Sequence, residues 1–237
     1  MTGPLPRIMR PVSPAFPAGF ILAEYDARHA KRLALDEATL PADERALAES
    51  FRSTPRRTGF TAGRLALHGA LVAGGDSEGA TRSVLRDERG RPQPSWSAAP
   101  RISIAHTRAR AIAAVAPIDS CAAIGIDVEE VDEARAHAIV RMSLSPDELA
   151  RVQAIDEALL HGPLALWCAR ESCVKAHALE VGWFGTALVA TRIEVCDAAI
   201  DDATHAWNIE ISFESHAPMW AHAWHARNAI FAVAMRR

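Results

Sequence analysis

No apolar run in the 237-residue sequence approaches the length that a helix needs to span a bilayer. The opening segment, MTGPLPRIMRPVSPAFPAGF, is interrupted by prolines and lacks the apolar centre of a signal peptide. The formal net charge is only −3 and no basic amphipathic stretch is present, so neither nucleic acid nor an anionic membrane is an expected partner. We therefore expect a soluble, cytoplasmic protein that acts as a monomer.

The sequence also lacks a cysteine pattern. Its four cysteines form no CxxC pair and no spacing typical of zinc; they are Cys121, Cys168, Cys173 and Cys196. Without an export signal, they are interpreted as reduced thiols. Apolar residues make up 49% and charged residues 23% of the chain, a balance typical of a globule that buries a sizeable core.

The first part of the chain shows mainly helical patterns. The segment up to Phe20 is predicted to be extended coil because prolines recur in it. Helices are expected over residues 43–51 and 57–72, and Gly74-Gly75 ends the second one. Gly90-Arg91-Pro92 predicts a turn.

From Ile102 the pattern changes to short apolar runs typical of strands. Strands are expected over residues 102–106, 111–116, 122–128, 191–195, 206–213, 219–225 and 228–235. Because strands and helices are grouped rather than strictly alternating, we predict an α+β fold.

Helical signals return between these two groups of strands. Helices are expected over residues 134–142, from Pro146 onward, and over 164–181 with Gly182 as the stop. Ser145 and Glu148 predict a capping box at the start of the middle helix. The boundary between two halves is expected at residues 117–120, which gives an N-terminal half of residues 1–118 and a C-terminal half of residues 119–237.

The first fragment that carries chemistry is IGIDVE at residues 124–129. Alternation along a strand puts Asp127 and Glu129 on the same face. Two carboxylates that point the same way suit a hard cation such as Mg²⁺, which prefers oxygen ligands. An acidic strand end that faces solvent is the alternative interpretation.

The second fragment is WCARESCVKA at residues 167–176. On a helix, Trp167, Glu171 and Lys175 share one face at four-residue spacing. The functional interpretation makes Glu171 a third carboxylate near the metal and Lys175 a contact to phosphate. The alternative is a surface ion pair beside a buried tryptophan.

Two further fragments carry groups that bind anions. ISIAHT at residues 102–107 ends a strand in His106 and Thr107, a usual position for binding groups, although a lone histidine is often structural. The planar guanidinium group of arginine binds phosphate through paired N–H donors. The alternative interpretation is that these arginines are simply solvated around a helix. The arginines in question are Arg52, Arg56, Arg57, Arg64 and, later in the chain, Arg91.

Taken in order, these fragments resemble the Sfp-type 4′-phosphopantetheinyl transferases, including the branch found in siderophore pathways. That family shows a Gly-(Lys/Arg)-Pro turn, a strand ending in His-Ser or His-Thr, a Gly-Ile-Asp-x-Glu strand and a Trp-x-x-Lys-Glu-x-x-x-Lys-Ala helix. The corresponding stretches are GRP at residues 90–92, HT at 106–107, GIDVE at 125–129 and WCARESCVKA at 167–176. The resemblance spans about residues 60–195. Arg170 departs from it, because the family usually has lysine there and the two cations are not equivalent at a tight phosphate site.

The resemblance implies two similar α+β halves related by a pseudo-twofold, with the substrate in the cleft between them. It implies that a serine hydroxyl of an apo acyl- or peptidyl-carrier protein attacks the β-phosphate of coenzyme A, and that 3′,5′-adenosine bisphosphate leaves. Mg²⁺, or Mn²⁺ in its place, is the implied cofactor. The carrier stays open, and with it the choice among fatty acid, polyketide, nonribosomal peptide and siderophore synthesis.

The resemblance also assigns roles to single residues. The implied metal ligands are Asp127, Glu129 and Glu171. The implied contacts to coenzyme A are Arg64 with Arg56 or Arg57 at the 3′-phosphate, His106 and Lys175 at the pyrophosphate, and Arg91, Thr107 and Arg170 nearby. The expected catalytic set is Asp127, Glu171 and Lys175. Glu171 is the expected base for the serine proton, and its roles as base and as metal ligand are not separated by sequence.

Three other interpretations were weighed. A catalytically silent paralogue would bind coenzyme A or a carrier protein without reaction, and the departure at Arg170 leaves this open. A different coenzyme A or nucleotide transferase would not need all three carboxylates together with Lys175. His222 and His225 invite a metal interpretation, but alternation makes them diverge, so a half-buried strand is favoured.

Overall fold

The computed structural model of the protein describes residues 6–11, 16–180, 187–197, 200, 202–214 and 216–236. The chain forms two compact units, Met1–Ala122 and Ala123–Arg237, and each has its own sheet and core. Helices and antiparallel sheets are grouped along the chain, so the predicted α+β class is confirmed. Among the described residues, no helix is both long and apolar enough to cross a bilayer.

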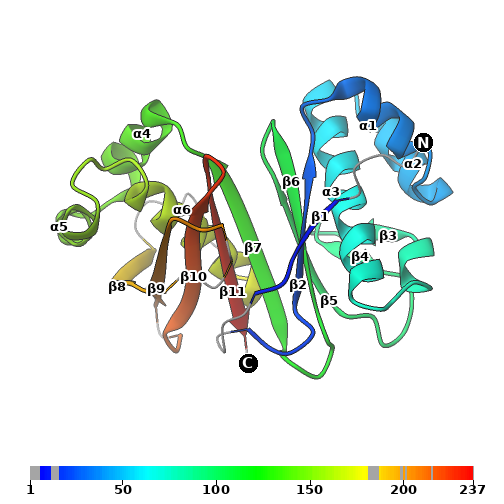
Figure 1. The fold of residues 1–237 in the computed structure, drawn as a ribbon. Helices are drawn as coiled ribbons and strands as arrows, with labels where there is room; N and C mark the ends of the chain where they lie inside the picture. Colours follow the sequence, from blue (N-terminus) through cyan, green and yellow to red (C-terminus); the bar gives the residue numbers. More distant parts are fainter. Residues whose placement is uncertain are drawn as a thin grey trace. The chain divides into compact units, whose positions relative to one another are not determined.

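Unit 1 is built on a four-stranded antiparallel sheet in the order β1-β2-β6-β5 (Figure 1). A small hairpin, β3 with β4, forms a separate two-stranded sheet. The elements are β1 (Arg7–Met9), β2 (Ile21–Asp26), α1 (Ala30–Glu37), α2 (Ala42–Ser50), α3 (Thr54–Ala73), the short 3-10 helix η1 (Gly79–Thr81), β3 (Val84–Arg86), β4 (Pro92–Pro94), β5 (Arg101–His106) and β6 (Arg110–Ala116).

The core of unit 1 forms where α3 packs on the sheet. Ala62, Ala66 and Ala70 lie four residues apart on α3 and are fully buried in one cluster with strand residues such as Ala23 and Ala113. Small side chains on both elements let the helix lie close to the sheet. The helix ends at Ala73, as the sequence predicted.

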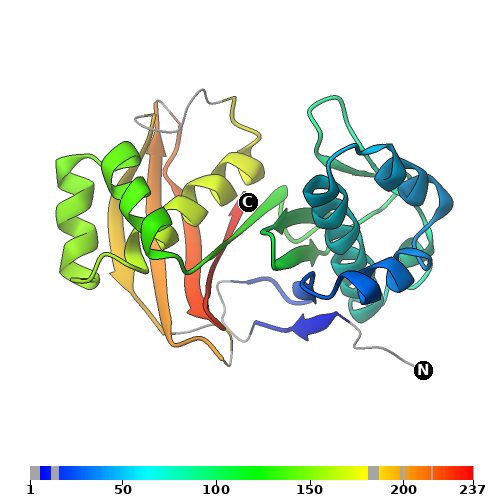
Figure 2. The ribbon, with the colours of Figure 1, turned by 90° about the horizontal axis from the view of Figure 1, so that it is seen from above.

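Unit 2 is built on a five-stranded sheet in the order β7-β11-β10-β9-β8, in which every neighbouring pair is antiparallel. Helix α6 covers one face of this sheet, and α4 and α5 lie beside α6 (Figure 2). The elements are β7 (Ala123–Glu130), α4 (Glu133–Ser143), α5 (Pro146–Ile155), α6 (Gly162–His177), β8 (Leu188–Val195), β9 (His205–Phe213), β10 (Met219–Ala226) and β11 (Ala229–Arg236).

The two units share an order of elements. In unit 1, β2 is followed by α1, α2 and α3 and pairs with the final strand β6, which also pairs with β5. In unit 2, β7 is followed by α4, α5 and α6 and pairs with the final strand β11, which also pairs with β10. In both units the third helix is the longest, and it packs on the sheet.

Most predicted elements are present, and the capping box is confirmed in full. The Ser145 hydroxyl accepts the Glu148 N–H (3.3 Å), and the Glu148 carboxylate accepts the Ser145 N–H (3.0 Å). Strands β5, β6 and β7 correspond to the predicted strands at residues 102–106, 111–116 and 122–128 and differ from them only at their ends. The same holds for the last four strands, β8 to β11.

Three predictions need correction. The segment up to Phe20 is not all coil, because β1 pairs with β2 there. Helix α1 was missed, since it buries only Leu33 and so carries a weak apolar pattern. The last helix ends at His177, followed by Ala178 with a left-handed φ of 52°, and not at Val181; the predicted stop at Gly182 lies outside the described residues.

Candidate active site

Gly125 lets helix α6 touch strand β7 directly. A Cβ atom at this position would lie 2.0 Å from the carbonyl oxygen of Ser172 and 2.6 Å from the backbone nitrogen of Ala176. No side chain fits in that space, so glycine is required for the helix to lie this close to the strand. Since alternation puts Gly125, Asp127 and Glu129 on one face, both carboxylates lie on the face that α6 covers.

Asp127 is bonded to Lys175 across this contact. The Lys175 Nζ donates to Asp127 Oδ1 (2.8 Å) and to the carbonyl oxygen of Ile126 (2.9 Å). Burial by itself would lower the pKa of Lys175, but the charges of Asp127 and Glu171 outweigh it and raise this pKa. The ammonium group therefore stays protonated at neutral pH.

Glu129 is bonded to an arginine that sequence reasoning did not single out. Arg135 Nη2 on α4 donates to Glu129 Oε1 (3.0 Å), and its guanidinium carbon lies 4.9 Å from the ring centroid of Trp167. Trp167 therefore supplies a flat surface on which this arginine rests. Burial raises the pKa of Glu129, Arg135 lowers it, and the charge of Asp127 raises it, with a raised pKa as the result.

Glu171 on α6 belongs to the same group of charges. Burial raises the pKa of its carboxyl, the charge of Asp127 raises it further, Lys175 acts in the opposite direction, and Glu129 adds to the rise. The structure thus brings Asp127, Glu129, Glu171 and Lys175 into one electrostatic group. Spacing along strand and helix predicted the two pairs, and the family resemblance implied that they meet. A carboxyl with a raised pKa is a better proton acceptor than an ordinary one.

The donor set of this group fits a hard cation. Three carboxylates face only two cations, Lys175 and Arg135, which leaves an excess of negative charge on oxygen donors. Among the described residues, the carboxylate oxygens do not all lie within 4.8 Å of one another. Asp127 and Glu129 are instead each paired with a cation, Lys175 and Arg135 respectively.

In unit 1, three arginines gather around two phenylalanine rings. The guanidinium carbon of Arg56 lies 5.0 Å from the centroid of Phe51, and that of Arg64 lies 4.8 Å from the centroid of Phe60. Arg86, from strand β3, lies 5.1 Å from the first ring and 5.2 Å from the second. Burial and the charge of Arg56 lower the pKa of Arg86. Three cations held this close give this part of unit 1 a concentrated positive charge.

Arg64 is the most enclosed member of this cluster. Its side chain is 4% exposed; Nη2 donates to the carbonyl oxygen of Leu85 (3.1 Å), and Nε lies 3.7 Å from Glu44 Oε1. Burial lowers the pKa of Arg64 to about 10, Glu44 raises it, and Arg86 lowers it. Arg64 remains charged at neutral pH and fixes helix α3 to the β3–β4 hairpin.

The other predicted arginines lie elsewhere or have acidic partners. Arg57 pairs with Glu37 (2.6 Å), and Arg91 pairs with Asp87 (2.6 Å) inside the turn. Arg52 is exposed. An anion at either Arg57 or Arg91 would have to share the arginine with its carboxylate, whereas Arg56 and Arg86 contact aromatic rings.

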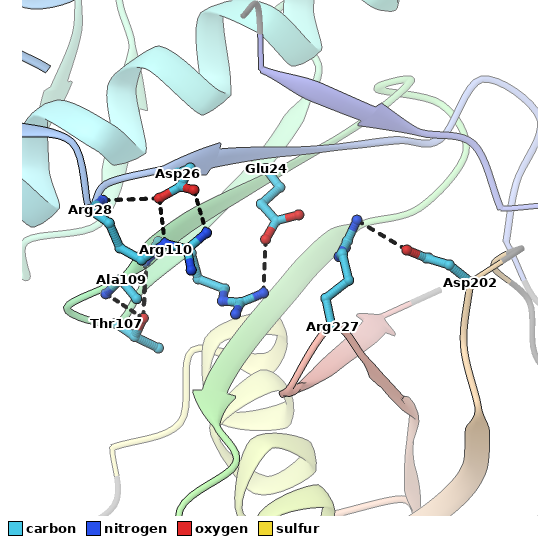
Figure 3. A network of polar contacts seen from close by, with 8 residues as sticks. All are labelled: Glu24, Asp26, Arg28, Thr107, Ala109, Arg110, Asp202 and Arg227. Atoms are coloured by element: carbon cyan, nitrogen blue, oxygen red, sulfur yellow. Dashed lines mark hydrogen bonds and ion pairs between the residues drawn. The ribbon is translucent and has the colours of Figure 1, made fainter. Parts of the chain in front are cut away.

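His106 and Thr107 end strand β5 next to helix α3. A Cβ at Gly59 would lie 2.6 Å from the imidazole of His106, so this glycine makes room for the ring. The Thr107 hydroxyl accepts the N–H groups of Ala109 (3.1 Å) and Arg110 (3.2 Å), which shapes the turn into β6 (Figure 3). The turn thereby fixes the backbone on which His106 stands.

Arg170 points away from the carboxylates, and in this structure it is not available to a coenzyme phosphate. It is 1% exposed; Nη2 donates to Glu148 Oε1 (2.6 Å), and Nη1 donates to the carbonyl oxygen of Ser143 (3.0 Å). Glu148 Oε1 also accepts the N–H of Ala190 (2.7 Å). The expected coenzyme contact is replaced by a buried link among α4, α5, α6 and β8.

Comparison with known families gives a match within unit 2. Residues 123–234 match the model of the 4′-phosphopantetheinyl transferase superfamily. The matched segment contains Asp127, Glu129, Glu171 and Lys175, and it spans β7 through most of β11. No curated protein matches the sequence.

Sequence reasoning missed one arginine in each unit, Arg86 in the cluster of unit 1 and Arg135 in the charged group of unit 2. Arg86 lies only four residues before the Gly90-Arg91-Pro92 turn, and the opposite strand of that hairpin follows directly, so its place beside α3 depends on tertiary packing. Arg135 lies six residues after Glu129, and helix α4 turns it back to that carboxylate. Neither position has a periodic signal of its own.

Proposed function

We propose that the protein transfers the 4′-phosphopantetheine arm of coenzyme A to a serine of an apo acyl- or peptidyl-carrier protein, with release of 3′,5′-adenosine bisphosphate. The observation that carries the proposal is the group of Asp127, Glu129, Glu171 and Lys175 within the domain that matches the transferase superfamily. The order of the unit 1 motifs supports an Sfp-type enzyme that serves secondary metabolism, with siderophore pathways among the candidates.

Mg²⁺ is the cofactor that the donor set suits best. Asp127, Glu129 and Glu171 would hold it through carboxylate oxygens, the ligands that Mg²⁺ prefers. When bound, it offsets negative charge on the phosphate oxygens of the reaction. Mn²⁺ accepts the same oxygen ligands and is the expected substitute.

Glu171 is proposed to take the proton of the attacking serine. Its raised pKa, caused first by burial and then by Asp127, favours that role over an ordinary exposed glutamate. Lys175 is proposed to hold Asp127 in place and to contact the pyrophosphate, since its ammonium group remains charged.

In unit 1, the arginine cluster is proposed to bind the 3′-phosphate of coenzyme A. Arg56 and Arg86 lie on aromatic rings, and Arg64 completes the cluster. His106 is proposed as a pyrophosphate contact, with Thr107 and the Arg91 turn near the nucleotide. In this proposal, unit 1 supplies contacts to the phosphates of coenzyme A, and unit 2 supplies the carboxylates that would hold the metal.

The silent-paralogue alternative loses its main support. It depended on the lysine-to-arginine departure at position 170, and the link from Arg170 to Glu148 gives that arginine a structural reason. The electrostatic group of Asp127, Glu129, Glu171 and Lys175 also argues against a silent protein.

The decisive experiment mixes the protein with coenzyme A, Mg²⁺ and a panel of apo-carrier proteins, and measures carrier mass by intact-protein mass spectrometry. One carrier is expected to gain the phosphopantetheine arm, and chelator should abolish the gain. Asp127→Ala should be inactive, while Glu157→Ala, at an exposed acid away from the group, should match the natural protein. A panel in which no carrier gains mass, or full activity in excess chelator, would overturn the proposal.

A further inference from the structure

Three histidines from separate parts of unit 2 meet at one point. His205 on β9 and His225 on β10 stand directly opposite each other in the strand register. His161, at the start of α6, stacks on His225 with ring centroids 4.3 Å apart, and its ring lies 5.7 Å from that of His205. One ring nitrogen of each histidine lies within 4.8 Å of those of the other two.

The rings are held by neighbours that leave nitrogens facing the cluster. The Thr204 hydroxyl lies 2.7 Å from Nδ1 of His225 and 3.2 Å from Nδ1 of His205. A hydroxyl on Nδ1 directs the second nitrogen, Nε2, toward a ligand. In His225 this Nε2 is buried and has no hydrogen-bond partner.

The backbone that carries the third histidine is held by an aspartate. Asp156 Oδ2 accepts the backbone N–H groups of His161 and Gly162, each at 2.7 Å, and so closes the turn that leads into α6. Loop, helix start and two strands are therefore all fixed around the imidazoles. A buried nitrogen without a hydrogen-bond partner is energetically costly, and a bound ion would satisfy it.

We propose that His161, His205 and His225 form a binding site for a divalent transition metal, with Zn²⁺ as the representative ion. Three imidazole nitrogens suit Zn²⁺, Ni²⁺, Co²⁺ or Cu²⁺ and are poor ligands for Mg²⁺. A water molecule completes the tetrahedron that Zn²⁺ prefers. In a tetrahedron, two ligands at the usual Zn–N distance of about 2.1 Å lie about 3.4 Å apart. Ring nitrogens that lie within 4.8 Å of one another therefore close by up to about 1.4 Å on binding.

This site is separate from the carboxylates that are proposed to hold Mg²⁺. His225 on β10 lies opposite Ile230 on β11, and Ile230 lies opposite Glu129 on β7. The backbones of His225 and Glu129 are therefore two strand spacings apart, about 10 Å. The metal ties the start of α6 to β9 and β10, on the far side of Ile230 from the carboxylates. Its proposed role is to fasten the end of the helix that carries Glu171 and Lys175.

The test measures Zn²⁺ binding to the full chain, purified without a histidine tag and stripped with chelator. Isothermal titration calorimetry should give one Zn²⁺ per chain. His205→Ala, at an exposed position, and His225→Ala should each weaken binding by about 10- to 100-fold or more, as expected when a metal site loses part of its support. The matched control His137→Ala, at an exposed histidine on α4, should bind as the natural protein does.

A second readout identifies the ligands directly. Co²⁺ in place of Zn²⁺ should give the visible absorption of a tetrahedral site in the natural protein and in Asp127→Ala, but not in His205→Ala. Circular dichroism checks that each variant is folded. Equal Zn²⁺ affinity in the natural protein and in His205→Ala and His225→Ala would overturn the site, as would loss of Zn²⁺ binding in Asp127→Ala or an absence of one-to-one binding.

Discussion

At the scale of single residues, Glu171 has the surroundings that most affect its chemistry. Its carboxyl is partly buried, it is repelled by Asp127 and Glu129, and Lys175 compensates only in part. The burial and repulsion that destabilise its charged form also raise its pKa, which makes the carboxylate a better proton acceptor. Its two proposed roles, general base and metal ligand, predict different results when Glu171 is substituted.

We expect Glu171→Gln to transfer the arm about 10²- to 10⁴-fold more slowly at every Mg²⁺ concentration, because a positioned base is lost. The measurement is the transfer rate against Mg²⁺ concentration, alongside coenzyme A affinity by calorimetry. Glu157→Gln is the matched control, since this glutamate is exposed. Recovery of near-natural rates at high Mg²⁺ would instead make Glu171 a metal ligand only, and an unchanged rate would remove both roles.

At the scale of elements, the β3–β4 hairpin brings an arginine to helix α3. Arg86 contacts both Phe51 and Phe60, and Arg56 and Arg64 contact one ring each. The hairpin thus adds a third cation, Arg86, to the two that helix α3 supplies.

Arg86→Ala should weaken the binding of coenzyme A but leave that of dephospho-coenzyme A nearly unchanged. A lost charge-assisted contact costs about 1.5–3 kcal/mol, which corresponds to about 10- to 150-fold in affinity. Calorimetry with both coenzymes makes the comparison, and Arg89→Ala, an exposed arginine of the same hairpin, is the control. An equal loss for both coenzymes would show that Arg86 acts through the fold and not through the 3′-phosphate.

A second link between elements is the ion pair of Arg170 with Glu148. Because both side chains are almost fully buried, removal of one partner leaves the other charge unpaired in the interior. Arg170→Ala should lower the free energy of unfolding by about 3–5 kcal/mol, as measured by chemical denaturation, while the KM for coenzyme A stays unchanged at temperatures where the variant is folded. The exposed Arg141→Ala should do neither. A raised KM with normal stability would restore the coenzyme contact that the sequence implied.

The sequence predicted elements well where local chemistry determines them. Most of β9 alternates between buried and more exposed residues, β11 is a continuous buried apolar run, and the Ser145 capping box is a local hydrogen-bond pattern. Regular periodicity also placed Asp127 with Glu129 on β7 and Glu171 with Lys175 on α6, whereas the meeting of the two pairs was implied only by the family resemblance.

What the sequence did not reveal depends on tertiary contacts. The burial of Arg170, the approach of Arg86 to α3 and the meeting of His161 with His225 are each made by residues far apart in the chain. The earlier argument that His222 and His225 diverge is compatible with the three-histidine cluster, since the partners of His225 come from β9 and the α6 loop. No single-sequence periodicity reports contacts of that kind.

At the scale of the whole molecule, buried histidines make the stability of the protein depend on pH. His222 is 8% exposed, its Nδ1 lies 3.0 Å from Asn208 Oδ1 and 3.8 Å from the Cys196 sulfur, and burial lowers its pKa. Above about pH 6.5, the ordinary value for histidine, the ring is neutral in both folded and unfolded chains. Below it the unfolded chain takes up the proton first, so stability is lost as pH falls.

The free energy of unfolding should therefore decrease from pH 7 to pH 5, by at most about 1.4 kcal/mol per pH unit for this one group. Urea denaturation at a series of pH values measures it. His222→Gln should flatten the profile relative to the natural protein, whereas His137→Gln, at an exposed position, should not. A profile that His222→Gln leaves just as steep would assign the pH dependence to other groups.

The pairing of β7 with β11 also bears on the order in which the molecule is made. The strand that carries Asp127 and Glu129 finds its hydrogen-bond partner about a hundred residues later, with Ala123 opposite Arg236 at the far end of the register. Contacts so distant along the chain form late and slowly. During synthesis on the ribosome, the acidic strand therefore stays without its neighbour until β11 emerges, and Asp127 and Glu129 take their final places only after all the strands between β7 and β11 have been made.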